Sequence, residues 1–179
     1  MSSAAVRRGG AGARAAFVAR FLVLFALLAY GGFLSDAPRR YAGVLRVAGT
    51  ATSPLINGWS LEQREAPSGR QEIWFRRGND QLRLALGLQS MALSLLPLLA
   101  LLGATPGLGV RGLASRAAIG VTALFGLDLL VVLLYPWLID RSAVADVAGT
   151  FLGLLTFVGG PVILWFALTY RALRDVWRL

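Results

Sequence analysis

Apolar residues in this chain gather into four long runs, separated by segments that hold most of the charges. The runs cover residues 15–34, 84–102, 117–139 and 147–170. A helix needs about 20 mainly apolar residues to cross the hydrocarbon core of a bilayer, and each run has about that length. The pattern therefore predicts an all-α integral membrane protein with four transmembrane helices.

The segments between the runs predict how the helices are connected. Residues 1–14 form an N-terminal tail, and residues 35–83 form one long polar insertion between the first and second runs. The connectors between the later runs are short and contain Gly, Pro or charged residues. Residues 84–179 are therefore expected to form a three-span bundle of antiparallel neighbours, with a C-terminal tail on the same side as the N-terminal one.

The beginning of the insertion has the features of a short amphipathic helix. Asp36 is placed to cap it and Pro38 lies in its first turn. Apolar side chains then recur at helical spacing, at Tyr41, Val44, Leu45 and Ala48. We expect this helix to lie on the membrane surface.

The rest of the insertion predicts a β-hairpin. Trp59 and Leu61 alternate with polar residues before the turn "APSG", and Ile73 and Phe75 do so after it. An isolated hairpin is marginal in water, so it must lean on the surface helix, the bilayer or a partner. Trp59, Trp74 and Phe75 are the expected partner or membrane-surface contacts. The alternative is a solvated loop that two tryptophans anchor to the membrane.

Composition supports the membrane assignment and excludes several kinds of chemistry. Of the 179 residues 56% are hydrophobic and only 15% are charged, more apolar surface than a soluble domain of this size can bury. All 18 basic residues are Arg. They lie between the apolar runs, where they anchor spans at the interface, so no nucleic-acid partner is expected. The chain has no Cys and no His, which leaves no expected metal site, cofactor or thiolate nucleophile.

The arginines also predict orientation. Each side of the predicted topology carries nine of them, but those on the side of the two tails lie in short segments near span ends, which have more influence. Both termini are therefore expected in the cytoplasm, with residues 35–83 outside. The first run could be a signal peptide, although its length favours an uncleaved signal-anchor.

One carboxylate lies inside an apolar run. Asp128 costs about 3 kcal/mol at the centre of a membrane helix, which the surrounding Leu, Val, Ile and Phe residues offset. Thr156 of the fourth run could reach it at comparable depth, and Gln89 and Ser90 of the second run lie somewhat nearer the outer surface. The sequence favours an inter-helix polar clasp or a partner contact. A proton relay is the alternative, but it usually needs several ionisable groups.

The order of these segments resembles a known family. One N-terminal span and a small extracytoplasmic hairpin precede "LPLLALLGATPG" and a late "GGPVILW", as in the small membrane proteins that accompany exosortase H in bacterial gene clusters. The resemblance covers about half the chain. It implies a bacterial inner-membrane protein that supports the sorting of proteins with C-terminal membrane-embedded tails. The exosortase itself uses Cys, Arg and His, so this chain is not expected to be the enzyme.

The sequence thus predicts a non-catalytic accessory or subunit of a bacterial membrane assembly. Its expected partners are the lipid bilayer and another integral membrane protein. Two alternatives stay open. One is a small proton-coupled transporter component in which Asp128 titrates, and the other is a structural subunit of a respiratory or photosynthetic complex.

Overall fold

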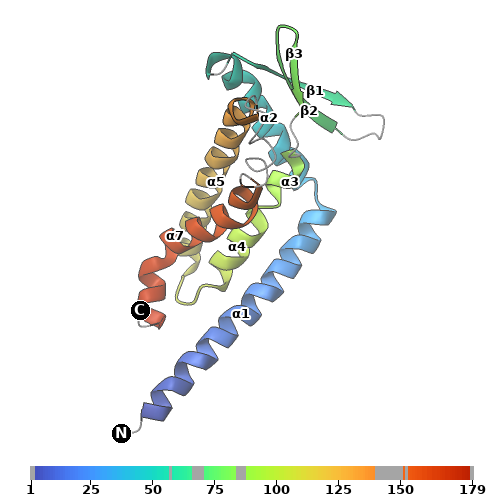
Figure 1. Ribbon diagram of the computed structural model, residues 1–179. Coiled ribbons are helices and arrows are strands. Elements are labelled where there is room, and N and C mark those ends of the chain that lie inside the picture. Colours follow the sequence, from blue (N-terminus) through green and yellow to red (C-terminus); the bar gives the residue numbers. More distant parts are fainter. Residues whose placement is uncertain are drawn as a thin grey trace.

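The protein is a helical bundle with a small sheet at one end (Figure 1). The computed structural model describes residues 3–56, 58–65, 71–83, 88–139, 151 and 153–177. Both labelled termini lie at the end of the bundle opposite the sheet. In chain order the elements are α1 (Ser3–Leu34), α2 (Ala37–Ile56), β1 (Ser60–Glu65), β2 (Gln71–Arg77), β3 (Asp80–Arg83), α3 (Leu88–Ala92), α4 (Leu95–Ala104), α5 (Val110–Ile139), η1 (Leu155–Gly159) and α7 (Gly160–Trp177).

Three of the described helical segments are long and apolar enough to cross a membrane. They are Gly12–Leu34 in α1, Val110–Leu138 in α5, and Leu155–Arg174, which joins η1 to α7. The first and third expected spans are therefore found as continuous helices. The beginning of the fourth expected span, at residues 147–150, lies outside the described residues.

The expected second span, residues 84–102, is not confirmed: its described part belongs to a shorter apolar helical stretch, Ser90–Ala104, with turns between α3 and α4. After α3 the chain makes tight turns, in which the amides of Leu93 and Ser94 bond the carbonyls of Ser90 and Met91 at 3.0 Å. Pro97 has no N–H to offer the carbonyl of Leu93, which instead accepts from the Leu96 amide at 3.1 Å. The following helix, α4, has 10 residues and is about 15 Å long, half the thickness of a bilayer core. Residues 84–87 lie outside the described part of the chain.

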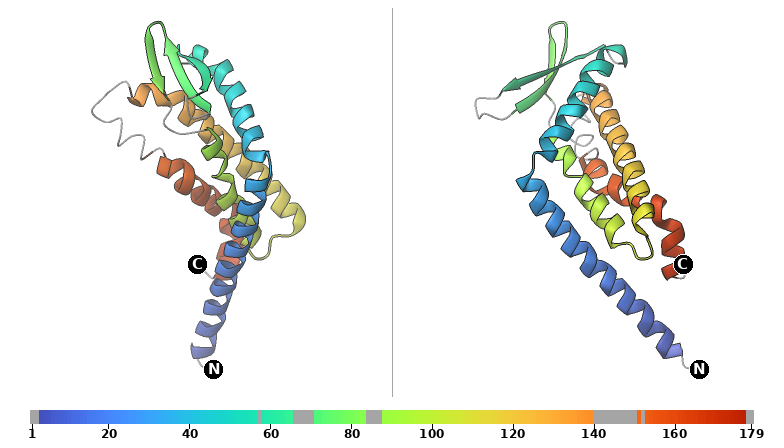
Figure 2. Two further views of the ribbon diagram at one scale, coloured as in Figure 1. Left: turned by 90° about the vertical axis from the view of Figure 1, so that its right-hand side faces the viewer. Right: turned by 180° about the vertical axis from the view of Figure 1, so that it is seen from behind.

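Helix α2 is longer than the surface helix that the sequence predicts, and it packs differently. Its 20 residues bury Ala42, Leu45, Gly49 and Ser53, whereas Val44 is 60% exposed. The helix lies alongside the half of α5 nearest the sheet rather than apart from the bundle (Figure 2). Gly49 permits the close approach, since a Cβ there would lie 3.5 Å from Val132 Cγ1. The buried face is thus a helix-packing face.

The predicted hairpin is present and is extended by a third strand. The sheet has the order β1-β2-β3 and is antiparallel. Leu61 pairs with Phe75, and Phe75 pairs with Leu82 on the other side. Gly78, with φ +59, allows the tight turn into β3 that the sequence analysis did not predict. The turn "APSG" lies outside the described residues.

Two apolar clusters hold the molecule together. The outer cluster joins one face of the sheet to α2, α3 and α5, and its largest fully buried members include Phe75, Leu45 and Met91. The inner cluster joins α4, α5 and α7 around Leu98, Leu102 and Leu124. Helix α1 contributes Phe17 and Phe21 to its edge, yet its most apolar window is 0% buried. Most of α1 therefore faces the surroundings of the bundle.

Candidate functional site

Asp128 is buried in the middle of α5 and is held by α2. Its side chain is 0% exposed, and the Tyr41 hydroxyl donates a hydrogen bond to Asp128 Oδ2 at 2.5 Å. A bond to a carboxyl group inside an apolar interior is stronger than one in water. The sequence prediction of a polar clasp thus acquires a partner that it did not name. We call this pair the Tyr41–Asp128 clasp.

The surroundings of Tyr41 keep its phenol in the donor form. The Tyr41 ring meets the Phe125 ring edge to face, with centroids 5.7 Å apart. Burial raises the pKa of Tyr41 above its usual value, and the hydrogen bond and the negative charge of Asp128 raise that pKa further. The phenol therefore remains protonated at physiological pH and continues to donate to the carboxyl.

The other predicted partners of Asp128 do not hold it among the described residues. Thr156 is 0% exposed and lies in η1, but its Oγ1 has no hydrogen-bond partner there, and neither does Asp128 Oδ1. Ser90 is exposed, and the side chain of Gln89 lies outside the described part of the chain. The clasp consequently joins α5 to α2 rather than to α7 or α4.

The three predicted contact residues fall on opposite faces of the sheet. Trp59 is 3% and Phe75 0% exposed, because both belong to the outer cluster that joins the sheet to the bundle. The Phe75 ring stacks on that of Tyr135 of α5, with centroids 6.0 Å apart. These two residues are therefore core residues rather than surface contacts. Trp74 points to the other face and keeps part of its surface exposed.

The face of the sheet that carries Trp74 is charged and locally ordered. The Arg64 guanidinium lies over the Trp74 ring, 5.3 Å from its centroid. Glu62 Oε2 lies 3.0 Å from Arg64 Nη2, and Glu62 Oε1 lies 3.6 Å from Arg76 Nη1. We call Glu62, Arg64, Trp74 and Arg76 the outer face of the sheet. Together they place one partly exposed aromatic ring among paired charges.

The arrangement offers a fixed polar contact and a charged sheet face. Within the described ranges, no group of three or more His, Cys, Asp or Glu side chains could hold a metal ion. A buried polar group of the inner cluster also forms a hydrogen bond within the bundle. It is the Trp165 indole, whose Nε1 donates to Thr105 Oγ1 at 2.9 Å.

The sequence reasoning missed Tyr41 as the partner of Asp128. The two residues are 87 positions apart, and no periodic pattern relates residues at that separation. The available signal was the amphipathic face that carries Tyr41, because an apolar face with Gly49 and Ser53 on it is typical of close helix packing.

Comparisons with known proteins do not suggest a function for this chain. No family model matches the chain, and neither a curated protein nor a solved structure is detectably similar to it. Function is therefore argued from the clasp, the sheet and the membrane-length helices.

Proposed function

We propose that the chain is a non-catalytic accessory subunit of a membrane assembly, which presents the outer face of its sheet to another integral membrane protein. The observation that carries the proposal is the Tyr41–Asp128 clasp. It holds the carboxylate of the membrane-length helix α5 in a bond that fixes α2 to the bundle. This use of an intramembrane carboxyl is architectural.

The sheet has the properties of a rigid platform. The apolar face of the sheet packs on α2, α3 and α5 through the outer cluster. The opposite face, which carries Trp74, is therefore held at a fixed position relative to the spans. Fixed aromatic and charged groups bind a partner with little loss of side-chain entropy. The exposed apolar surface of α1 offers a second contact inside the bilayer.

The resemblance to exosortase-associated proteins names the partner to test first. In the proposal the chain lies in a bacterial inner membrane and supports exosortase-type sorting, with the enzyme supplying the chemistry. A proton-coupled role for Asp128 is the competing proposal, and the substitution of Asp128 separates the two.

Trp74→Ser should weaken partner recovery. A tagged chain would be co-expressed with an exosortase from the same genome and purified in mild detergent, and the enzyme-to-chain ratio would be measured. Loss of one partly exposed aromatic anchor typically costs about 2 kcal/mol of binding, a reduction of roughly thirtyfold in affinity. Trp137→Ser is the matched control, because Trp137 is 63% exposed at the end of α5. Equal recovery for both variants would contradict docking on the outer face.

The proposed orientation can be tested without removing any native thiol, because the chain has no cysteine. Asn79→Cys lies in the exposed β2–β3 turn, and Ser115→Cys lies on an exposed position near the beginning of α5. A membrane-impermeant maleimide should label Asn79→Cys in intact spheroplasts and Ser115→Cys only after lysis. The reverse pattern would place the sheet in the cytoplasm and exclude an external docking role.

A further inference from the structure

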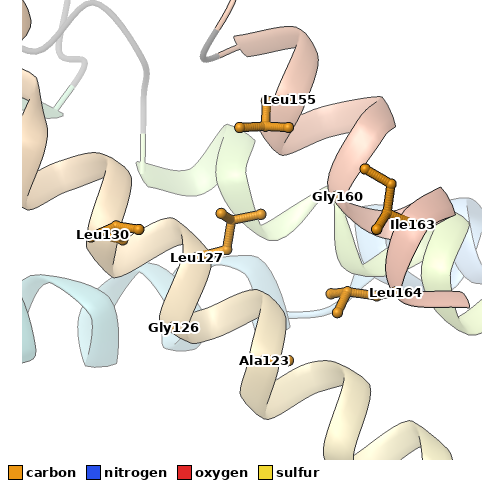
Figure 3. Close-up of a pocket in the computed structure, with 8 residues that line it drawn as sticks. All are labelled: Ala123, Gly126, Leu127, Leu130, Leu155, Gly160, Ile163 and Leu164. Carbon is orange, nitrogen blue, oxygen red and sulfur yellow. The ribbon is translucent and has the colours of Figure 1, made fainter. Parts of the chain in front are cut away.

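An open groove lies between α5 and α7, and its described lining is entirely apolar (Figure 3). Its volume is about 410 Å³. Side chains from the two helices point towards each other across it. The lining residues are Ala123, Gly126, Leu127 and Leu130 of α5, Leu155 of η1, and Gly160, Ile163 and Leu164 of α7.

Small residues make the groove. Gly160 brings the two helices together, since a Cβ there would lie 2.8 Å from Leu127 Cδ2. Gly126 leaves a gap beside this contact, because a Cβ at that position would meet nothing within 4 Å. The result is an apolar groove beside the α5–α7 contact.

Two arginines lie at the same end of this groove. Arg116 is seven residues before Ala123 on α5, and Arg171 is seven residues after Leu164 on α7. A spacing of seven residues is two helical turns, so each arginine shares a helix face with the groove residue above it. Arg116 lies at the contact between the two helices, since its Nε donates to the Leu168 carbonyl of α7 at 2.9 Å.

The distances match one leaflet of a bilayer. Leu130, at the far end of the groove, lies fourteen residues beyond Arg116, about 21 Å along the helix. The span from the headgroup region to the midplane is also about 20–22 Å. A lipid phosphate at the level of the arginines would therefore place its acyl chain along the groove.

We propose that the α5–α7 groove binds a phospholipid with an anionic headgroup. The chain packs between the two helices and the headgroup meets Arg116 and Arg171. Lipid tails are as apolar as Leu, so chain packing alone gives little preference among lipids. The arginines therefore supply the selectivity, since each basic group near the membrane surface strengthens anionic lipid binding by about fivefold.

The proposal is tested by the lipid that stays bound to the full chain. The protein would be purified in mild detergent, incubated with equal amounts of phosphatidylglycerol and phosphatidylcholine of the same chain length, and examined by native mass spectrometry. The native chain should retain phosphatidylglycerol preferentially. Gly126→Leu fills the groove while raising helix propensity, and it should lose the bound lipid. Arg171→Gln should lower phosphatidylglycerol retention about fivefold.

Matched controls lie on another helix. Gly31→Leu also fills open space on α1, where a Cβ would meet nothing within 4 Å, and Arg20→Gln removes an exposed arginine of α1. Both variants should bind lipid as the native chain does. Equal retention of the two lipids would overturn the proposal. The proposal would also be overturned if the native chain formed a dimer and Gly126→Leu were monomeric. A second copy of the chain, rather than a lipid, would then fill the groove.

Discussion

Replacing Phe75 by alanine is expected to lower the free energy of unfolding by about 3–5 kcal/mol. The side chain is 0% exposed and lies where the sheet, α2 and α5 meet. Truncation leaves a cavity and removes the ring that stacks on Tyr135. Denaturant titration in mild detergent, followed by near-ultraviolet circular dichroism, measures the change.

Trp74→Ala is the matched control for this substitution. Trp74 adjoins Phe75 on the same strand but points to the outer face of the sheet, where it keeps part of its surface in solvent. Its replacement should cost about 1 kcal/mol. Similar costs for the two variants would mean that the sheet is not sealed onto the bundle. That result would also contradict the proposal that the sheet is a rigid platform for a partner.

The parts of the fold that the sequence predicts are those set by local patterns. Composition and length alone are enough to predict the spans in α1 and α5. An uninterrupted apolar helix forms its backbone hydrogen bonds within itself and needs no tertiary contact for them. Alternation of Trp59 and Leu61, and of Ile73 and Phe75, likewise predicts two strands whose apolar sides share one face.

The second run has a feature that such patterns do not predict. Hydropathy averaged over residues 84–102 does not register the break between α3 and α4, which depends on individual bonds. The Ser94 hydroxyl donates to the Met91 carbonyl at 2.5 Å, and Pro97 removes one amide from the helix. Pro97 alone is compatible with a kinked span, and only its combination with the turns at Leu93 and Ser94 shortens the helix.

The candidate site was predicted only in part for a related reason. An aspartate in an apolar span predicts a polar partner, and that half of the clasp follows from residues 121–136 alone. The identity of the partner depends on how α2 packs, which Gly49 and Leu45 permit through their approach to α5. Trp59 and Phe75 were misassigned because a hairpin considered in isolation has no neighbour to cover its apolar face.

Substitutions at the Tyr41–Asp128 clasp should separate an architectural role from proton transfer. Asp128→Leu leaves the half-buried Tyr41 hydroxyl without its acceptor, and Tyr41→Phe removes the donor of the buried Asp128 carboxyl. Each single change should destabilise the protein by about 1–3 kcal/mol, because a buried polar group loses its partner. The double variant should cost less than the sum of the two, since it leaves neither group unsatisfied. The expected coupling energy is about 0.6–2 kcal/mol.

Asp128→Asn decides between the two functions. The amide oxygen can still accept from the Tyr41 hydroxyl, so an architectural clasp predicts near-native stability and full recovery of the partner in mild detergent. An amide cannot titrate near neutral pH, so proton coupling predicts that Asn abolishes pH-dependent flux in liposomes as completely as Leu does. The accessory role is falsified if Asp128→Asn inserts, folds and assembles normally yet loses function to the same extent as Asp128→Leu. Retention of function by Asn, together with its loss in Leu, would instead assign the carboxyl to holding α2 and the sheet against α5.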